Sequence, residues 1–330
     1  MLRRQDVGHR VVVRRIVGIS EGRTQFSDTL GELVELSETH LTVATGKGEL
    51  RVPLAEVHRA KRVPAARRPV AGAVVDLELA ANEAWPAPVQ DRLGGWLLRA
   101  ADGWTGRGNS ALPVGDPDRP LPAAIDAVES WYAARGLPAR INVPLPLAGP
   151  VGVALDERGW RAQPPVLVQT ASLAALLDRM PHRADLPTVE LLEEPSDAWL
   201  ALVAARKSGP DRPANRLPEA ALRLLTAVPT IRFAHVYAST GGQELLAVAR
   251  GTVTGQRGRW LGLTLLEVVP AARRRGLALH VLRALTRWAA GLGATDAFLQ
   301  VEEHNAAAVA LYRRLGFTTH HTYVSRVAPD

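Results

Sequence analysis

The 330-residue sequence contains no cysteine. This absence excludes disulfide bonds, thiolate metal ligands and a cysteine nucleophile, and it is compatible with a reducing compartment. The first ten residues, MLRRQDVGHR, are basic but lack the apolar centre of a signal peptide. No uncharged apolar run is long enough to cross a membrane. We therefore expect a soluble, cytoplasmic protein that makes no membrane contact.

Aromatic residues are few, at 5% of the sequence, whereas hydrophobic residues reach 47%, enough to build sizeable cores. The formal net charge is +7, and arginine supplies most of the positive charge. An arginine-rich overall composition could account for this charge. An anionic partner, such as a phosphorylated cofactor, an acidic substrate or a nucleic acid, is the alternative explanation.

The length indicates two or three domains. Residues 1–66 are expected to form a small SH3-like β-barrel, because short β-prone runs alternate with turn signals such as Thr45-Gly46-Lys47-Gly48. The strands expected in this barrel are Val11–Ile16, Gly31–Leu36, Leu41–Ala44 and Leu50–Pro53. The stretch RVPAARRPV, residues 62–70, resembles a linker.

Beyond residue 70 the pattern is typical of an α/β protein, with a second plausible boundary at Pro181–Pro187. We therefore expect domains at 67–184 and 185–330. Helical periodicity covers Leu121–Ala134, Asp197–Ala205, Pro218–Ala227, Ala278–Leu292 and Ala306–Leu315. Strands are expected at Gly95–Ala100, Ile231–Ala238, Leu245–Val253, Trp260–Val269 and Ala297–Val301.

These two parts contain a weak internal repeat with an offset of 157 residues. In each copy a helix ends in glycine, a strand follows, and a second helix closes on Gly-aromatic, at Gly159-Trp160 and at Gly316-Phe317. One fold unit is therefore expected twice, although two unrelated α/β segments could also give this pattern by coincidence.

The most informative motif is the strand end LLEVVP, residues 265–270, followed by Arg273-Arg274-Arg275-Gly276-Leu277-Ala278 and a helix. Proline ends the strand, and glycine allows the backbone to approach a ligand closely. The start of the helix presents free amides and the positive end of its dipole. Together these features predict an anion site suited to a pyrophosphate. A basic turn that caps a surface helix is the alternative interpretation.

This order of motifs resembles the GNAT acetyltransferase superfamily. Its pyrophosphate loop, Gln/Arg-x-x-Gly-x-Gly/Ala, matches Arg273 to Ala278, and its preceding strand end matches Val268-Val269-Pro270. A second landmark of the family matches Asn305, Tyr312 and Gly316-Phe317. The resemblance covers about residues 187–330. It implies a mixed twisted sheet flanked by helices and an acyltransferase that passes the acetyl group of acetyl-CoA to an amine.

The resemblance also implies roles for particular residues. Backbone groups near Val268 and Val269 would bind the pantetheine arm, and the amides of Arg274 to Ala278 would hold the pyrophosphate. Asn305 would contact the cofactor arm, and Tyr312 would protonate the leaving thiolate. The amine would attack the thioester directly, in agreement with the absence of cysteine. No metal is expected.

Several of these roles have alternatives. Tyr312 could only pack, and Asn305 could only cap the helix that begins at Ala306. Glu267 is the candidate general base, because a carboxylate in an apolar strand is costly unless it is used or paired. It could instead lie on the solvated side of its strand. Glu302 and His304 are rivals for the role of base, and His280 is expected to be structural.

Residues 67–184 resemble the degenerate first half of some actinobacterial GNAT proteins, through the stretch Gly94–Arg99 and the stretch Arg107–Ser110. The repeat places Gly115–Leu121 where the second half has its arginine loop. That segment carries two aspartates and lies between Pro113 and Pro122, which lack amide hydrogens, so we expect no anion site there. The two halves are expected to pack as a pseudo-dimer within one chain.

Two other functions remain open. The protein could be a non-catalytic sensor of acyl-CoA, or the basic barrel could bind nucleic acid through Arg3, Arg4, Arg10, Arg14 and Arg15. We do not expect nucleic-acid binding, because the strands offer few aromatic residues for base stacking. The acceptor could be a protein lysine, a protein N-terminus, an antibiotic or a polyamine. The loop Arg206–Leu217 between two expected helices carries both signs of charge and does not decide among them.

Overall fold

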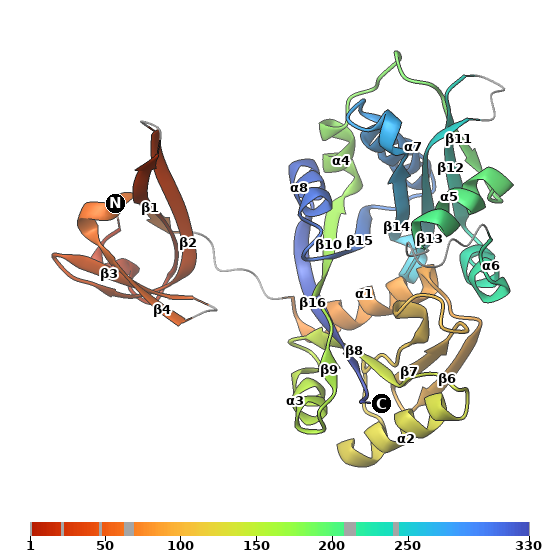
Figure 1. The fold of residues 1–330 in the computed structure, drawn as a ribbon, viewed down its shortest axis with the longest axis horizontal. Coiled ribbons are helices and arrows are strands. Elements are labelled where there is room, and N and C mark those ends of the chain that lie inside the picture. Colours follow the sequence, from red (N-terminus) through yellow and green to blue (C-terminus); the bar gives the residue numbers. More distant parts are fainter. Residues whose placement is uncertain are drawn as a thin grey trace. The chain divides into compact units, whose positions relative to one another are not determined.

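The computed structural model describes residues 2–20, 23–45, 48–62, 69–207, 216–239 and 244–329. The chain divides into two compact units, residues 1–68 and residues 69–330 (Figure 1). Parts of the expected linker and of the turn at residues 45–48 lie outside the described residues.

The first unit is an antiparallel sheet with the strand order β4-β3-β2-β1-β5. Alternating apolar residues on its inner face are fully buried, among them Val11, Val13 and Leu33. The four expected strands are present, and a fifth follows them. The sheet is compatible with a small barrel, and its SH3-like character stays a prediction. The strands are β1 (Arg10–Ser20), β2 (Arg23–Leu36), β3 (His40–Thr45), β4 (Gly48–Pro53) and β5 (Val57–Arg62).

The second unit is a mixed α/β fold, as expected. Its helices are α1 (Ala71–Ala84), α2 (Leu121–Ala133), α3 (Gly149–Glu157), α4 (Leu173–Arg179), α5 (Asp197–Lys207), α6 (Glu219–Thr226), α7 (Leu277–Gly291) and α8 (Ala306–Leu315). Its strands are β6 (Val89–Leu93), β7 (Trp96–Ala100), β8 (Arg140–Leu145), β9 (Arg161–Ala162), β10 (Val166–Ser172), β11 (Val189–Leu192), β12 (Ile231–Tyr237), β13 (Leu245–Thr254), β14 (Trp260–Val268), β15 (Asp296–Glu302) and β16 (Thr318–Val327).

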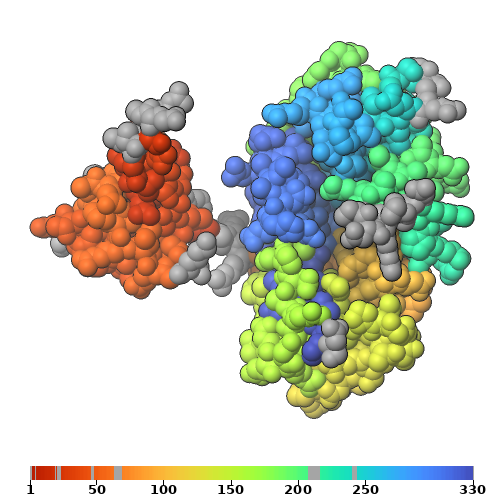
Figure 2. All heavy atoms as spheres, viewed as in Figure 1, coloured from red at the N-terminus to blue at the C-terminus, as the bar shows by residue number. Residues whose placement is uncertain are grey.

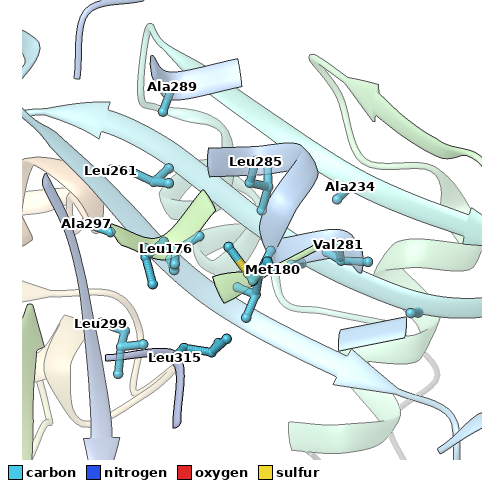
Figure 3. Packing of buried hydrophobic residues seen from close by; sticks show 14 of the residues in the cluster. Leu176, Met180, Ala234, Leu261, Val281, Leu285, Ala289, Ala297, Leu299 and Leu315 are labelled. Carbon is cyan, nitrogen blue, oxygen red and sulfur yellow. The ribbon is translucent and has the colours of Figure 1, made fainter. Parts of the chain in front are cut away.

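The large sheet of this unit has the order β11-β12-β13-β14-β15-β10-β16-β8, with β9 also paired to β16. Neighbouring strands are antiparallel except β14 and β15, which run parallel. Helices α4 and α7 pack on one face, where Leu176, Val281 and Leu285 meet strand residues such as Leu261 and Leu299 (Figure 3). The other face carries α1, α5 and α6.

The sequence repeat corresponds to a repeat of elements. Helix α2, strand β8 and helix α3 recur 157 positions later as α7, β15 and α8, within one or two residues. Strands β9 and β10 correspond in the same way to β16. The second unit, residues 69–330, therefore contains two tandem copies of the same element order: a middle part and a C-terminal part.

The last strands of the two tandem copies, β10 and β16, lie side by side, and each also pairs with a strand of the other copy. Val166 of β10 pairs with Tyr323 of β16, the residue 157 positions later. Strand β10 then pairs with β15 of the C-terminal part, while the end of β16 pairs with β8 of the middle part. Figure 2 shows the C-terminal residues in blue bordered by yellow-green residues of the middle part. Neither part therefore completes its own sheet.

Helices α1 and α4 were not expected from the sequence. Helix α1 is rich in alanine, so its apolar pattern contrasts little from one face to the other. It nevertheless buries Val74 and Leu77 and is fixed to β13 by the hydroxyl of Thr254, which donates to the Ala80 carbonyl over 3.0 Å. Helix α1 thereby covers the sheet face that carries Val168, Phe298 and Tyr323.

Candidate active site

Strands β14 and β15 separate after a short paired stretch. Trp260–Gly262 pair with Asp296–Phe298, and beyond these residues the two strands are no longer paired. On its other side β14 carries a bulge, because Leu265 and Leu266 both lie opposite Ala249 of β13. Leu265 has a φ of 54°, which is unusual for a residue other than glycine. Such strain is often found at functional sites.

The gap between the separated strands is a cavity of about 380 Å³. This volume is within the range of small-molecule sites. Side-chain alternation along β15 and the bulge in β14 give the cavity two sides. Leu263, Leu299 and Val301 join the core under α7, whereas Phe298 and Leu265 face α1 and α5. Residues of both sides line the cavity, so it connects the two faces of the sheet.

A loop of unusual backbone geometry joins the end of β14 to α7. Ala272 and Leu277 are buried and anchor the loop, while Arg273, Arg274 and Arg275 are exposed. Arg274 has a φ of 64° and Gly276 a φ of 93°. The first amides of α7 have no intrahelical acceptor, as at any helix start. With the helix dipole and three arginines beside them, these amides can hold an anion.

The strand end leading into this loop has one backbone amide that is not used in pairing with β13. The Val269 amide donates to the Leu246 carbonyl over 2.9 Å. Because donors alternate along a strand, the Val268 amide points toward the gap instead. The Val268 carbonyl accepts a 3.1 Å hydrogen bond from Nε of Arg273. Of the two valines, Val268 is therefore the one whose amide is placed for a ligand.

Tyr312 and Asn305 lie on the α8 side of the cavity. Burial raises the pKa of Tyr312 to about 12, so its phenol stays protonated at neutral pH. The Tyr312 ring packs edge-on against the Phe317 ring, with 5.7 Å between the two ring centroids. The Asn305 side chain accepts a hydrogen bond from the Ala308 amide at 3.2 Å and caps α8. Asn305 thus performs the capping role, and it also lines the cavity.

Glu267 also lines the cavity, where two arginines hold its carboxylate. Its side chain is 16% exposed. Arg273 donates to it at 3.2 Å, and Nε of Arg206 lies 3.2 Å from its other oxygen. Glu267 is therefore paired as well as placed in the cavity.

The rival residues have different environments. Glu302 lines the cavity but is exposed and lies 3.2 Å from the exposed His304. His280 bonds to the Pro187 carbonyl at 3.0 Å, away from the cavity lining. Most of the loop 206–217 lies outside the described residues, which include only Arg206, Lys207, Arg216 and Leu217 of this loop.

The cavity residues that the sequence did not single out include Trp85, Arg107, Gln300 and Tyr323. Trp85 follows the unexpected helix α1, and Arg107 begins a short 3-10 turn, Arg107–Asn109. These two residues belong to the middle part of the chain, so the cavity is built from both parts. The stretch Arg107–Ser110 was the one available signal.

Among the described residues, no group of three or more histidine or acidic side chains is arranged to hold a metal ion. The described helices include none with the length and apolar character of a membrane span.

This chain is similar in sequence to known proteins. The family model described as "Probable histone acetyltransferase Rv0428c C-terminal" matches residues 72–326. The protein of that name from Mycobacterium tuberculosis is 34% identical over 255 residues, which are 76% of this chain and 72% of that protein. The uncharacterized N-acetyltransferase YobR of Bacillus subtilis is 30% identical over 267 residues, covering 76% of this chain and 98% of YobR.

A solved GCN5-related N-acetyltransferase from Kribbella flavida has the same fold, with a TM-score of 0.58 at 17% identity. The match covers 80% of this chain and 97% of that one. The acetyltransferase relatives, this fold and the open pair of strands agree. The chain is an acyltransferase that belongs to the family of the Rv0428c C-terminal region, within the GNAT superfamily of N-acetyltransferases.

Proposed function

We propose that the protein transfers the acetyl group of acetyl-CoA to an amine by direct attack. The observation that carries this proposal is the position of the cavity. It opens where β14 leaves β15, and the anion loop, Arg273–Ala278, begins five residues after Val268, the last residue of the same strand. A pyrophosphate on the loop and a thioester in the gap would therefore be joined along β14.

The residues present fit this cosubstrate. The amides of Arg274 to Ala278 would hold the pyrophosphate, with Arg273 and Arg275 adding positive charge. The Val268 amide would bind the pantetheine arm, and Asn305 would contact it from α8. In this proposal Val269 contributes its position in the strand, since its own amide is already bonded to Leu246.

The acceptor would reach the thioester from the α1 and α5 side. Its nitrogen forms a bond to the acetyl carbon, and the bond from that carbon to sulfur breaks. The nitrogen loses a proton to Glu267, directly or through water, and the sulfur leaves as a thiolate. Tyr312 donates a hydrogen bond to this thiolate and supplies its proton. No residue becomes acylated, in keeping with a chain that lacks cysteine.

Glu267→Gln should lower kcat at neutral pH, because an amide cannot accept the proton of the amine. The rate should recover as the pH rises and more of the amine is free base. The pH–rate profile of the variant, compared with wild type, provides the measurement. An unchanged profile would assign proton removal to bulk or bound water.

We also propose that residues 67–184 and 185–330 are two GNAT-like domains packed as an intramolecular pseudo-dimer. Support comes from the repeated elements and from the exchanged strands β10 and β16. The middle domain would serve as a structural partner that also walls the acceptor side.

One chain should accordingly bind one acetyl-CoA. In the middle domain, the segment that corresponds to the anion loop is Gly115–Leu121. It packs against the β6–β7 turn, where the Gly95 amide donates a hydrogen bond to the Asp116 carbonyl. Leu155, which corresponds to Tyr312, is fully buried and has no hydroxyl. Calorimetric titration should give a stoichiometry near one per chain. Two sites per chain would contradict the structural role of this domain.

The activity itself can be tested with acetyl-CoA and a panel of amines, by following free CoA with a thiol reagent. The assay is clean because the protein has no thiol of its own. Amine-dependent release of CoA is expected. If acetyl-CoA binds but no amine accelerates release, the proposed transfer is wrong.

A further inference from the structure

The acceptor side of the cavity contains a cation from the middle part of the chain. Arg107 lines the cavity, and its Nη1 donates to Oε1 of Gln300 over 2.6 Å. Its guanidinium centre lies 4.6 Å from the centroid of the Trp85 ring. The stacking and the hydrogen bond fix the guanidinium at one place in the cavity wall.

Among the described residues, no carboxylate forms a close ion pair with this cation. The buried Glu78 acts on Arg107 only at longer range, and its own carboxylate lies 2.7 Å from Nε2 of His321. The acidic groups lining the cavity are engaged elsewhere, Glu267 with Arg206 and Arg273, and Glu302 with His304. A second buried cation, Arg250, lies 5.5 Å from the same Trp85 ring and also lacks an acidic partner within the described ranges. Burial lowers the pKa of Arg107 to about 10 and that of Arg250 to about 9. Both are still charged at pH 7.

The neighbouring polar groups also offer donors. Oε1 of Gln300 accepts from Arg107 and, at 3.3 Å, from the Tyr323 hydroxyl. These two donors fix the amide orientation, and they leave Nε2 of Gln300 as a buried donor without a partner in the described structure. A buried donor without an acceptor and a buried cation without a paired anion are both costly, unless a ligand supplies the acceptor and the negative charge.

We propose that Arg107 and Gln300 bind a carboxylate of the acceptor, so that the acceptor is a small amine that carries a carboxylate, of the amino-acid type. This assignment rests on the proposed acetyl transfer and names its substrate class. Arg107 binds the carboxylate on the acceptor face while the amine points toward the separated strands. A lysine within a cationic peptide would bring further positive charge toward Arg107 and Arg206.

The test compares matched acceptors that differ only in the carboxylate: lysine with cadaverine, phenylalanine with phenethylamine, and histidine with histamine. Wild type should show the higher kcat/KM for the carboxylate member of at least one pair. Arg107→Gln should lower that value roughly 10- to 150-fold, as expected for a lost charged hydrogen bond. The value for the partner amine should change little, and Arg107→Lys should retain part of the preference.

Arg135→Gln is a matched control, because Arg135 also stacks on a tryptophan, at 3.7 Å from Trp131, but lies outside the cavity lining. It should leave the preference unchanged. A thermal-shift series adds a readout that needs no turnover. Free amino acids should raise the Tm of wild type more than their amides do, and this difference should vanish in Arg107→Gln.

The outcomes separate the two proposals. If the wild-type protein neither binds acetyl-CoA nor releases CoA with any amine, the proposed function is wrong. The thermal shifts would still test the carboxylate site in that case. A wild-type preference for decarboxylated amines or lysine peptides would overturn the carboxylate proposal. So would a carboxylate preference that survives in Arg107→Gln, provided that the variant is folded by circular dichroism.

Discussion

Tyr312→Phe should reduce kcat by roughly 10²–10⁴-fold, the usual effect of losing a general acid. The affinity for acetyl-CoA should be nearly unchanged, because the phenol is proposed to act on the sulfur only as it leaves. Steady-state kinetics and calorimetry measure the two quantities on the same variant. The ring contact with Phe317 is retained in the variant, so the fold should be intact. Wild-type turnover would show that Tyr312 only packs.

The pH dependence of the wild-type enzyme gives a second test of the same residue. A proton donor is active while protonated, and burial raises the pKa of Tyr312 to about 12. The rate should therefore show no decline from ionisation of Tyr312 up to about pH 10, the ordinary pKa of tyrosine. A free thiol has a lower pKa, about 8.5, so the phenol first donates a hydrogen bond to the developing thiolate and then supplies its proton.

Gly276→Val should weaken acetyl-CoA binding by roughly 10²-fold or more, equivalent to losing one or two charge-assisted hydrogen bonds. Gly276 adopts a φ of 93°, which a β-branched residue rarely takes. The valine would therefore displace the backbone of the loop, whose amides are proposed to hold the pyrophosphate, and its Cβ would lie only 3.3 Å from Nη1 of Arg183. Calorimetry with acetyl-CoA measures the loss.

Gly293→Val controls for backbone strain alone. Gly293 has a φ of 88°, and an added Cβ there would meet no atom within 4 Å. It follows α7 at the end opposite to the loop. This variant should lose some stability but bind acetyl-CoA as wild type does. Equal losses in both variants would mean that strain, rather than the loop, explains the effect.

The sequence predicted the parts of the fold with strong periodicity or punctuation. Pro270 and Gly276 bracket the loop before α7, and Asn305 marks the start of α8, where the structure has them. The repeat offset of 157 residues is matched by the helices and strands of the two parts. These features are local, so residue spacing alone reveals them.

Long-range pairing could not be predicted in the same way. Strand β10 lies between β15 and β16, although it precedes them by more than a hundred residues. Arg107 reaches the cavity because the 3-10 turn that it begins meets Gln300 of β15. Such contacts depend on tertiary packing, and no spacing in the chain encodes them. Trp85 and Arg107 were therefore missed as cavity residues, whereas the loop before α7 was predicted from a local motif.

The proposed transfer of an acetyl group from acetyl-CoA to an amine can be measured directly in its products. The protein is incubated with acetyl-CoA and the amine panel, the products are analysed by mass spectrometry, and the CoA released is quantified. We expect an amine heavier by one acetyl group, in equal amount to the CoA, with the protein mass unchanged. Release of CoA without any acetylated amine, or a stably acetylated protein that does not pass the group on, would contradict it.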